Sequence, residues 1–165
     1  MSKIQYKVGN LIEALRDGEV EYLVHQCNCF CAMGAGIALQ LAKRWPEVRE
    51  ADNRTARGDK NKMGTFGLVP VGHQKVVVNL YGQYGASASE IQTDYTSLRE
   101  GLQRFNNLMW TIHEHRPVVG IPLIGAGLGG GDWGVISKII EEELIGCDVR
   151  CFVLDEGDIP NEDWI

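Results

Sequence analysis

The fold is decided by residues 25–48, HQCNCFCAMGAGIALQLAKRWPEV. An apolar strand leads into this stretch, alternating cysteines and an asparagine follow, and a Met-Gly-Ala-Gly turn runs directly into a helix. Ile37, Leu41 and Trp45 recur every four residues, which indicates a helix with one buried face. Two interpretations of the turn are open at this point: a thiol or metal site on the cysteines, or a pocket made from the bare backbone of the glycines.

The cysteine spacing favours the second interpretation. Cys27, Cys29 and Cys31 follow a C-x-C-x-C pattern, whereas zinc sites usually pair C-x-x-C knuckles with a second such pair or with histidines. Cys147 and Cys151 do not complete that pattern, and no cysteine of the first group begins the C-x₅-R cradle of a thiol phosphatase. We therefore expect reduced thiols that pack as small apolar residues, and no metal site.

Length and composition describe one ordinary globular domain. The chain has 165 residues, of which 44% are apolar and 23% charged, enough for a full core. The start, MSKIQYKVGN, lacks an apolar core of signal-peptide length, so we expect a cytoplasmic protein. The chain has a formal charge of -6 and no basic run, so we expect it to bind neither a nucleic-acid backbone nor a membrane. Amides of the protein backbone can still bind a small anion.

Strand and helix patterns alternate along the whole chain. This alternation predicts a three-layer α/β/α sandwich with a mixed, mostly parallel central sheet, in which ligands bind beyond the carboxyl ends of the strands. We expect a monomer with a single domain at 1–155 and an acidic tail at 156–165. Thr93 is the predicted N-cap of the longest helix. The predicted strands are 4–8, 21–26, 65–70, 75–82, 118–124 and 148–154, with a turn at 71–74, and the predicted helices are 10–18, 37–45, 46–58, 94–113 and 135–146.

Two of the strand-to-helix connections are rich in glycine. They are AMGAG at 32–36 and IGAGLGGGDWG at 124–134. Glycine permits positive φ and close approach of a ligand to the amides, and the following helix offers its positive end, so the two loops together can grip a diphosphate. GAGLGG matches G-x-G-x-x-G, but no acidic residue follows at the distance that a dinucleotide-binding fold requires. Glycines needed only for tight turns remain the alternative.

These motifs, taken in order, resemble one known family. KVGN, LVHQCN, MGAGIALQLAKRWP and IPLIGAGLGGGDW are similar to the corresponding segments of macrodomains, the ADP-ribose-binding fold. The resemblance covers residues 4–154 and is most specific at 25–46, which resembles the branch containing the fungal ADP-ribose 1''-phosphate phosphatase and the animal terminal ADP-ribose glycohydrolase. It implies ADP-ribose or ADP-ribose 1''-phosphate as ligand and no cofactor.

The resemblance also implies which residues form the binding site. Asn10 stands where many macrodomains have an aspartate that binds the adenine amino group, and Leu11 would add a backbone amide. Leu154 and Asp155 lie where an aromatic residue often stacks on adenine. The implied phosphate loops consist of Gly34, Ala35, Gly36 and Ile37, and of Ile124, Gly125, Ala126, Gly127, Leu128 and Gly129.

His25, Asn28 and Asp132 are the candidate catalytic residues. A histidine at the end of a strand can give or take a proton near neutral pH, and its alternative role is a hydrogen bond to a neighbouring carbonyl. Asn28 falls where the family places an asparagine near the distal ribose. The glycohydrolase branch uses a lysine after the central strand and an aspartate in the second glycine loop; here NLYGQYGAS has no lysine, and Asp132 stands three residues beyond the expected position.

Three functional hypotheses follow. The first is an ADP-ribose 1''-phosphate phosphatase in which His25 protonates the leaving oxygen or activates water, with Asn28 beside it. The second is a hydrolase that removes ADP-ribose from a modified protein or nucleic acid, with Asp132 replacing the missing aspartate. The third is a module that binds ADP-ribose without catalysis.

Overall fold

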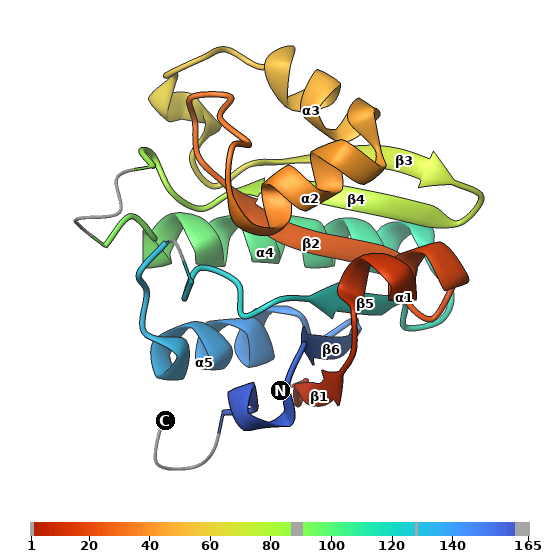
Figure 1. The fold of residues 1–165 in the computed structure, drawn as a ribbon. Helices are drawn as coiled ribbons and strands as arrows, with labels where there is room; N and C mark the ends of the chain where they lie inside the picture. Colours follow the sequence, from red (N-terminus) through yellow and green to blue (C-terminus); the bar gives the residue numbers. More distant parts are fainter. Residues whose placement is uncertain (1, 87–90, 128, 161–165) are drawn as a thin grey trace.

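A single mixed sheet forms the centre of the molecule. The computed structural model describes residues 2–86, 91–127 and 129–160, and in these ranges six strands pair in the order β1-β6-β5-β2-β4-β3 (Figure 1). All neighbouring strands run parallel except β3 and β4. The strands are β1 (Gln5–Val8), β2 (Tyr22–Cys27), β3 (Phe66–Gly72), β4 (Lys75–Tyr81), β5 (Val118–Ile121) and β6 (Asp148–Val153). The helices are α1 (Leu11–Asp17), α2 (Gly36–Arg44), α3 (Pro46–Asn53), α4 (Tyr95–Ile112) and α5 (Trp133–Glu143), with 3-10 turns η1 (Lys60–Lys62) and η2 (Glu156–Asp158).

Helices cover both faces of the sheet, which confirms the predicted α/β/α sandwich (Figure 1). α4 and α5 pack on one face around Leu102, Phe105 and Ile136, which are fully buried. α1, α2 and α3 pack on the other face around Leu15 and Leu41. Among the described residues, no helix combines the length and the apolar character needed to cross a membrane.

β2 lies inside the sheet between β4 and β5, and its side chains alternate between the two cores. Tyr22 and Val24 belong to the core under α4 and α5, and Leu23 and Cys27 belong to the core under α1, α2 and α3. Because side chains of a strand alternate with a period of two, His25 shares the face of Leu23 and Cys27. The position of His25 in the molecule follows from this parity.

Two helices begin where an aspartate caps them. The side chain of Asp94 accepts the N–H of Ser97 at 3.2 Å, so Asp94 rather than the predicted Thr93 is the N-cap of α4. Asp132 likewise accepts the N–H of Gly134 at 2.8 Å, and α5 therefore begins two residues earlier than predicted. Carboxylates satisfy the free amides of a first helical turn well, and their position fixes where each helix starts.

The hairpin and α3 also end differently from the prediction. β3 and β4 are joined by a turn at 73–74, shorter than the predicted turn at 71–74, because β3 continues through the residues before it. α3 ends at Asn53 instead of near residue 58. The Thr55 hydroxyl donates to the carbonyl of Asp52 at 2.6 Å, so a side-chain hydrogen bond satisfies a backbone carbonyl at the end of the helix.

Candidate functional site

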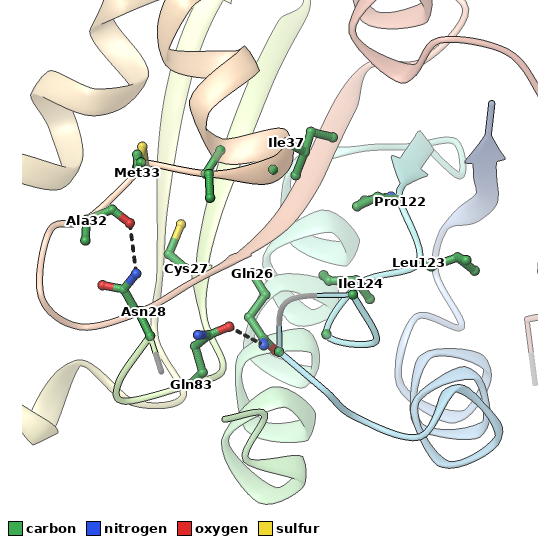
Figure 2. A pocket seen from close by; sticks show the side chains of 18 residues that line it. Gln26, Cys27, Asn28, Ala32, Met33, Ile37, Gln83, Pro122, Leu123 and Ile124 are labelled. Atoms are coloured by element: carbon green, nitrogen blue, oxygen red, sulfur yellow. Dashed lines mark hydrogen bonds between the residues drawn. The ribbon is translucent and has the colours of Figure 1, made fainter. Parts of the chain in front are cut away.

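A cavity of about 650 Å³ lies at the carboxyl ends of β2 and β5, which are adjacent parallel strands (Figure 2). This is the edge of the sheet at which open α/β folds bind their ligands. Both glycine-rich loops contribute to its wall, as predicted from their places after the two strands. The described residues that line it are 26–28, 32–38, 83, 86, 122–125, 127 and 129.

The first loop, between β2 and α2, is shaped by Asn28. The Asn28 amide donates to the carbonyl of Ala32 at 2.8 Å, and its side-chain oxygen accepts the N–H of Phe30 at 2.9 Å. Farther along, the Arg49 guanidinium donates to the carbonyl of Met33 at 2.9 Å. These bonds hold the loop open beside the cavity, so Asn28 both lines the cavity and positions the backbone that follows it.

α2 directs its amino end at this loop. Its N-cap residue, Ala35, has no side-chain acceptor, so no side chain from that position satisfies the first amides of the helix. Gly36, the first helical residue, has a φ of 59°, which glycine adopts without strain. Free amides together with the helix dipole attract an anion, and α2 therefore supplies positive potential without a charged side chain.

The second loop, after β5, is held by Thr93. The Thr93 hydroxyl donates to the carbonyl of Gly125 at 2.7 Å, and its backbone N–H donates to the carbonyl of Gly129 at 3.1 Å. Gly125 has a φ of 72°, and a Cβ at Gly129 would lie 2.5 Å from the Thr93 hydroxyl. The loop thus needs glycine at these positions so that its backbone can fold over Thr93.

An amide pair at the wall of the cavity joins the end of β2 to the segment that follows β4 (Figure 2). The Gln26 side chain donates to the Gln83 side-chain oxygen at 2.8 Å and to the Thr93 hydroxyl at 2.9 Å. Gln83 in turn donates to the carbonyl of Gly85 at 2.7 Å. Neither Gln26, Gln83 nor Thr93 was among the predicted site residues. The parity of β2 is the one sequence signal that points to Gln26, because it places this side chain opposite His25.

His25 is a core residue and does not line the cavity. Its side chain is fully buried, and its Nε2 lies 2.6 Å from the Asn79 side-chain oxygen on β4. Burial lowers the pKa of His25 from 6.5 to about 4, and the bond to Asn79 offsets this only in part. The neutral ring therefore donates its Nε2–H to Asn79, which in turn donates to the carbonyl of Val48 on α3 at 3.3 Å. The prediction that His25 faces the ligand is wrong, because strand parity turns it into the core.

Asp132 also lies outside the wall of the cavity. Its carboxylate caps α5, and its backbone N–H donates to the Tyr95 hydroxyl at 3.0 Å. It borders a separate surface depression with Arg99 and Lys138. The structure therefore does not place Asp132 where the missing aspartate of the second glycine loop would stand.

The residues predicted for adenine lie at the same edge of the sheet, after β1 and β6. Asn10 caps α1 by accepting the N–H groups of Ile12 and Glu13, and Leu11 is buried in the core. Leu154 is exposed, and Asp155 caps η2. Eight of the predicted loop residues line the cavity: Gly34, Ala35, Gly36, Ile37, Ile124, Gly125, Gly127 and Gly129. Ala126 does not line it, and Leu128 lies outside the described residues.

The fold is an α/β sandwich with a cavity at the carboxyl ends of β2 and β5, and two glycine-rich loops form part of the wall of this cavity. No protein-family model matches the chain. It is 30% identical over 148 residues to an uncharacterized 17.5 kDa protein of Enterobacteria phage T4, covering 84% of this chain and 88% of that protein. Among solved structures, a protein of unknown function from Bacteroides thetaiotaomicron superposes with a TM-score of 0.77 at 28% identity, covering 92% of this chain and 98% of that one. The macrodomain of Mycobacterium tuberculosis DarG superposes with a TM-score of 0.71 at 24% identity, with the same coverages. The chain belongs to the macrodomain family.

Several curated relatives have names that state an activity. The DNA ADP-ribosyl glycohydrolase of Mycobacterium tuberculosis is 27% identical over 149 residues, which are 86% of this chain and 38% of that protein. The ADP-ribose glycohydrolase OARD1 of Bos taurus is 26% identical over 152 residues, 92% of this chain and 91% of that protein. The ADP-ribose 1''-phosphate phosphatase of Saccharomyces cerevisiae is 40% identical over 50 residues, 30% of this chain and 27% of that protein.

Proposed function

We propose that the cavity binds ADP-ribose, with the diphosphate between the two glycine-rich loops. The observation that carries this proposal is that both loops present backbone to one cavity, and that the amino end of α2 faces it with no side-chain cap. Backbone amides and a helix terminus recognise a diphosphate without lysine or arginine. An acidic chain can therefore bind an anionic ligand at this one place.

The order of the strands supports one orientation of the ligand. β1 and β6 lie on one side of β5, and β2 and β4 lie on the other. We place adenine near Asn10 and Asp155, beyond β1 and β6, and the diphosphate in the cavity. The distal ribose then lies near Asn28 and Gln83, whose amides offer hydrogen-bond partners for its hydroxyls.

We propose that the reaction is the release of ADP-ribose from a modified macromolecule. Two glycohydrolases match this chain over more than four fifths of its length, whereas the likeness to the phosphatase covers 30% of it. In addition, the phosphatase hypothesis depended on His25, which is buried. The bond that is cleaved joins the distal ribose to an atom of the modified macromolecule. Water takes the place of that atom on the ribose.

The chemistry that this chain contributes to such a reaction is positioning. Cleavage at the ribose carbon passes through a transition state with positive charge on the sugar. Among the described lining residues, the polar side chains are the amides of Gln26, Asn28 and Gln83 and the thiol of Cys27. The amide oxygens can orient water and face the developing charge, while the loops fix the diphosphate; fixed geometry alone accelerates a reaction strongly.

The phosphatase activity is the second candidate. The local identity of 40% with the yeast phosphatase favours it. The first amides of α2 have no side-chain cap from Ala35, and such amides are suited to the negative charge that builds up on a transferred phosphate. Binding without turnover is the third outcome, and the shortage of acidic and basic side chains in the described wall favours that one.

Calorimetric titration with ADP-ribose tests the binding proposal, and Gly34→Asp is the informative variant. Gly34 lines the cavity, and a Cβ there meets nothing within 4 Å, so the fold tolerates the change. A carboxylate about 5 Å from a phosphate costs about 3 kcal/mol at an effective dielectric constant of about 20, so we expect at least about tenfold weaker binding. Gly67→Asp is the matched control, because Gly67 on β3 has equally open space and does not line the cavity. Equal affinities in both variants contradict the proposed site.

Turnover is then measured on two substrates in parallel, an ADP-ribosylated oligonucleotide or protein and ADP-ribose 1''-phosphate, by quantifying free ADP-ribose. Release from the macromolecule alone, abolished by Gly34→Asp and kept by Gly67→Asp, supports the glycohydrolase. Release from ADP-ribose 1''-phosphate alone supports the phosphatase. Tight binding with no release from either substrate leaves a binding module and refutes both activities.

A further inference from the structure

A second group of metal-ligating side chain types lies at the start of β2, the opposite end of this strand from the cavity. Glu21 directly precedes β2, and His113 and His115 follow α4. Each of the three offers one ligand atom within 4.8 Å of the ligand atoms of the other two. Two imidazoles and one carboxylate form a donor set that suits divalent transition metals, zinc among them.

The distances approach those of a metal site. Glu21 Oε1 lies 3.5 Å from His115 Nε2. Two donors bound to one zinc ion at about 2.1 Å in tetrahedral geometry are about 3.4 Å apart, so this pair already has the required spacing. The other ligand atoms lie within 4.8 Å of one another, so bringing them to that spacing requires a movement of up to about 1.4 Å. The side chain of His115 is 66% exposed and is therefore free to rotate by that amount.

The sheet holds Glu21 in place. Its backbone N–H donates to the carbonyl of Val118 at 2.9 Å, and its own carbonyl accepts the N–H of Val76 at 3.0 Å. The carboxylate oxygen Oε1 accepts the N–H of Val118 at 3.2 Å. The backbone and the carboxylate are thus fixed before any ion arrives, which lowers the conformational entropy lost on binding.

Tyr22 fixes the ring of His113. Its hydroxyl lies 2.7 Å from His113 Nε2, and its own ring is buried edge-on against Phe105. When Nε2–H donates to this hydroxyl, His113 Nδ1 keeps its lone pair and is the nitrogen that can bind a cation. Histidine ligands of metals usually donate their other N–H to an oxygen in this way, which sets both tautomer and orientation.

We propose that Glu21, His113 and His115 bind a divalent transition metal ion, with Zn²⁺ as the representative ion and water completing its coordination. The ion joins the start of β2 to the segment that connects α4 with β5. The alternative for the same residues is an ion pair between Glu21 and protonated His115, with His113 as the C-cap of α4. Only the metal site requires a metal ion, so metal binding distinguishes it from the ion pair.

The test is titration of Zn²⁺ into the full chain, prepared without an affinity tag and freed of metal by a chelator, together with thermal unfolding. We expect one Zn²⁺ per chain. At a free concentration of about a hundred times Kd, we expect the Tm to rise by about 5–10 °C. No binding to the wild-type chain overturns the proposal.

Three variants assign the site. His115→Ala removes an exposed ligand and should abolish the stoichiometric binding and the Tm rise without unfolding the chain. Tyr22→Phe keeps the ring but removes the partner of His113, and we expect an affinity lower by about tenfold. His73→Ala, in the turn between β3 and β4, is the matched control and should bind as wild type. Zn²⁺ binding that survives His115→Ala, through the cysteines for example, overturns the proposal, as does equal loss in His73→Ala.

Discussion

Replacing His25 by glutamine should remove a pH-dependent part of the stability of this protein. In the folded chain, burial lowers the pKa of His25 to about 4, whereas the unfolded chain has the ordinary value of 6.5. Between these values the unfolded chain binds a proton that the folded chain does not, so stability is complete above about pH 6.5 and falls as the pH approaches 4. The difference in pKa corresponds to about 3 kcal/mol.

The assay is urea unfolding of wild type and His25→Gln at a series of pH values from about 7 to about 4. Glutamine does not titrate, and its amide can donate to the Asn79 oxygen as the ring does. Other groups titrate in both proteins, so the informative quantity is the difference in the free energy of unfolding between them. We expect this difference to change by about 3 kcal/mol across the range, in the direction that disfavours wild type at low pH. His73→Gln, in an exposed turn, is the control.

Parallel curves for wild type and His25→Gln would refute this account of His25 as a buried neutral residue. A second outcome would refute it from the functional side. If His25→Gln folds and binds ADP-ribose but turns over neither substrate, His25 acts in the reaction and not in the core.

Three further changes test how the site is held. Thr93→Val removes the hydroxyl bonds to Gly125 and Gln26, so we expect a loss of about 1–3 kcal/mol in urea unfolding and weaker ADP-ribose binding by calorimetry; unchanged binding would contradict the role of Thr93. Asp94→Ala removes the cap of α4, with an expected cost of about 1 kcal/mol and no change in affinity. Phe105→Ala empties the core between Tyr22 and Phe66, where we expect a loss of about 3–5 kcal/mol in urea unfolding; a loss below about 1 kcal/mol would mean that the core closes around the missing ring.

The layers and the two glycine loops could be predicted from sequence because they depend on local patterns. Apolar periodicity marks the helices, and a strand that runs into glycines and then into a helix leaves few options for the backbone between them. That pattern locates the two loops, and the resemblance to macrodomains implies the eight loop residues that are found in the wall of the cavity. Strand order follows from the same alternation only in outline, since it depends on which strands pair.

The side chains that act on the loops could not be predicted in this way. β2 is covered on both faces, so both parities of YLVHQC are largely buried, and hydrophobicity alone does not show that His25 enters the core. Thr93 and Gln83 reach the site through bonds to segments far away in the sequence, for which no local pattern exists. The predicted helix at 135–146 leaves Asp132 in a loop, whereas in the structure α5 begins at Trp133 and continues through Gly134.

The burial of the thiols makes the chain suitable for site-specific labelling. Four of the five cysteines are buried, and burial raises the pKa of all four thiols, to about 12 for Cys147 and Cys151, so these four resist modification by reagents that require a thiolate. Cys31 is the partly exposed one, and it lies in the loop whose backbone Asn28 shapes. A single maleimide dye on Cys31 would therefore report by fluorescence on the loop between β2 and α2 when a ligand enters the cavity, without an engineered cysteine.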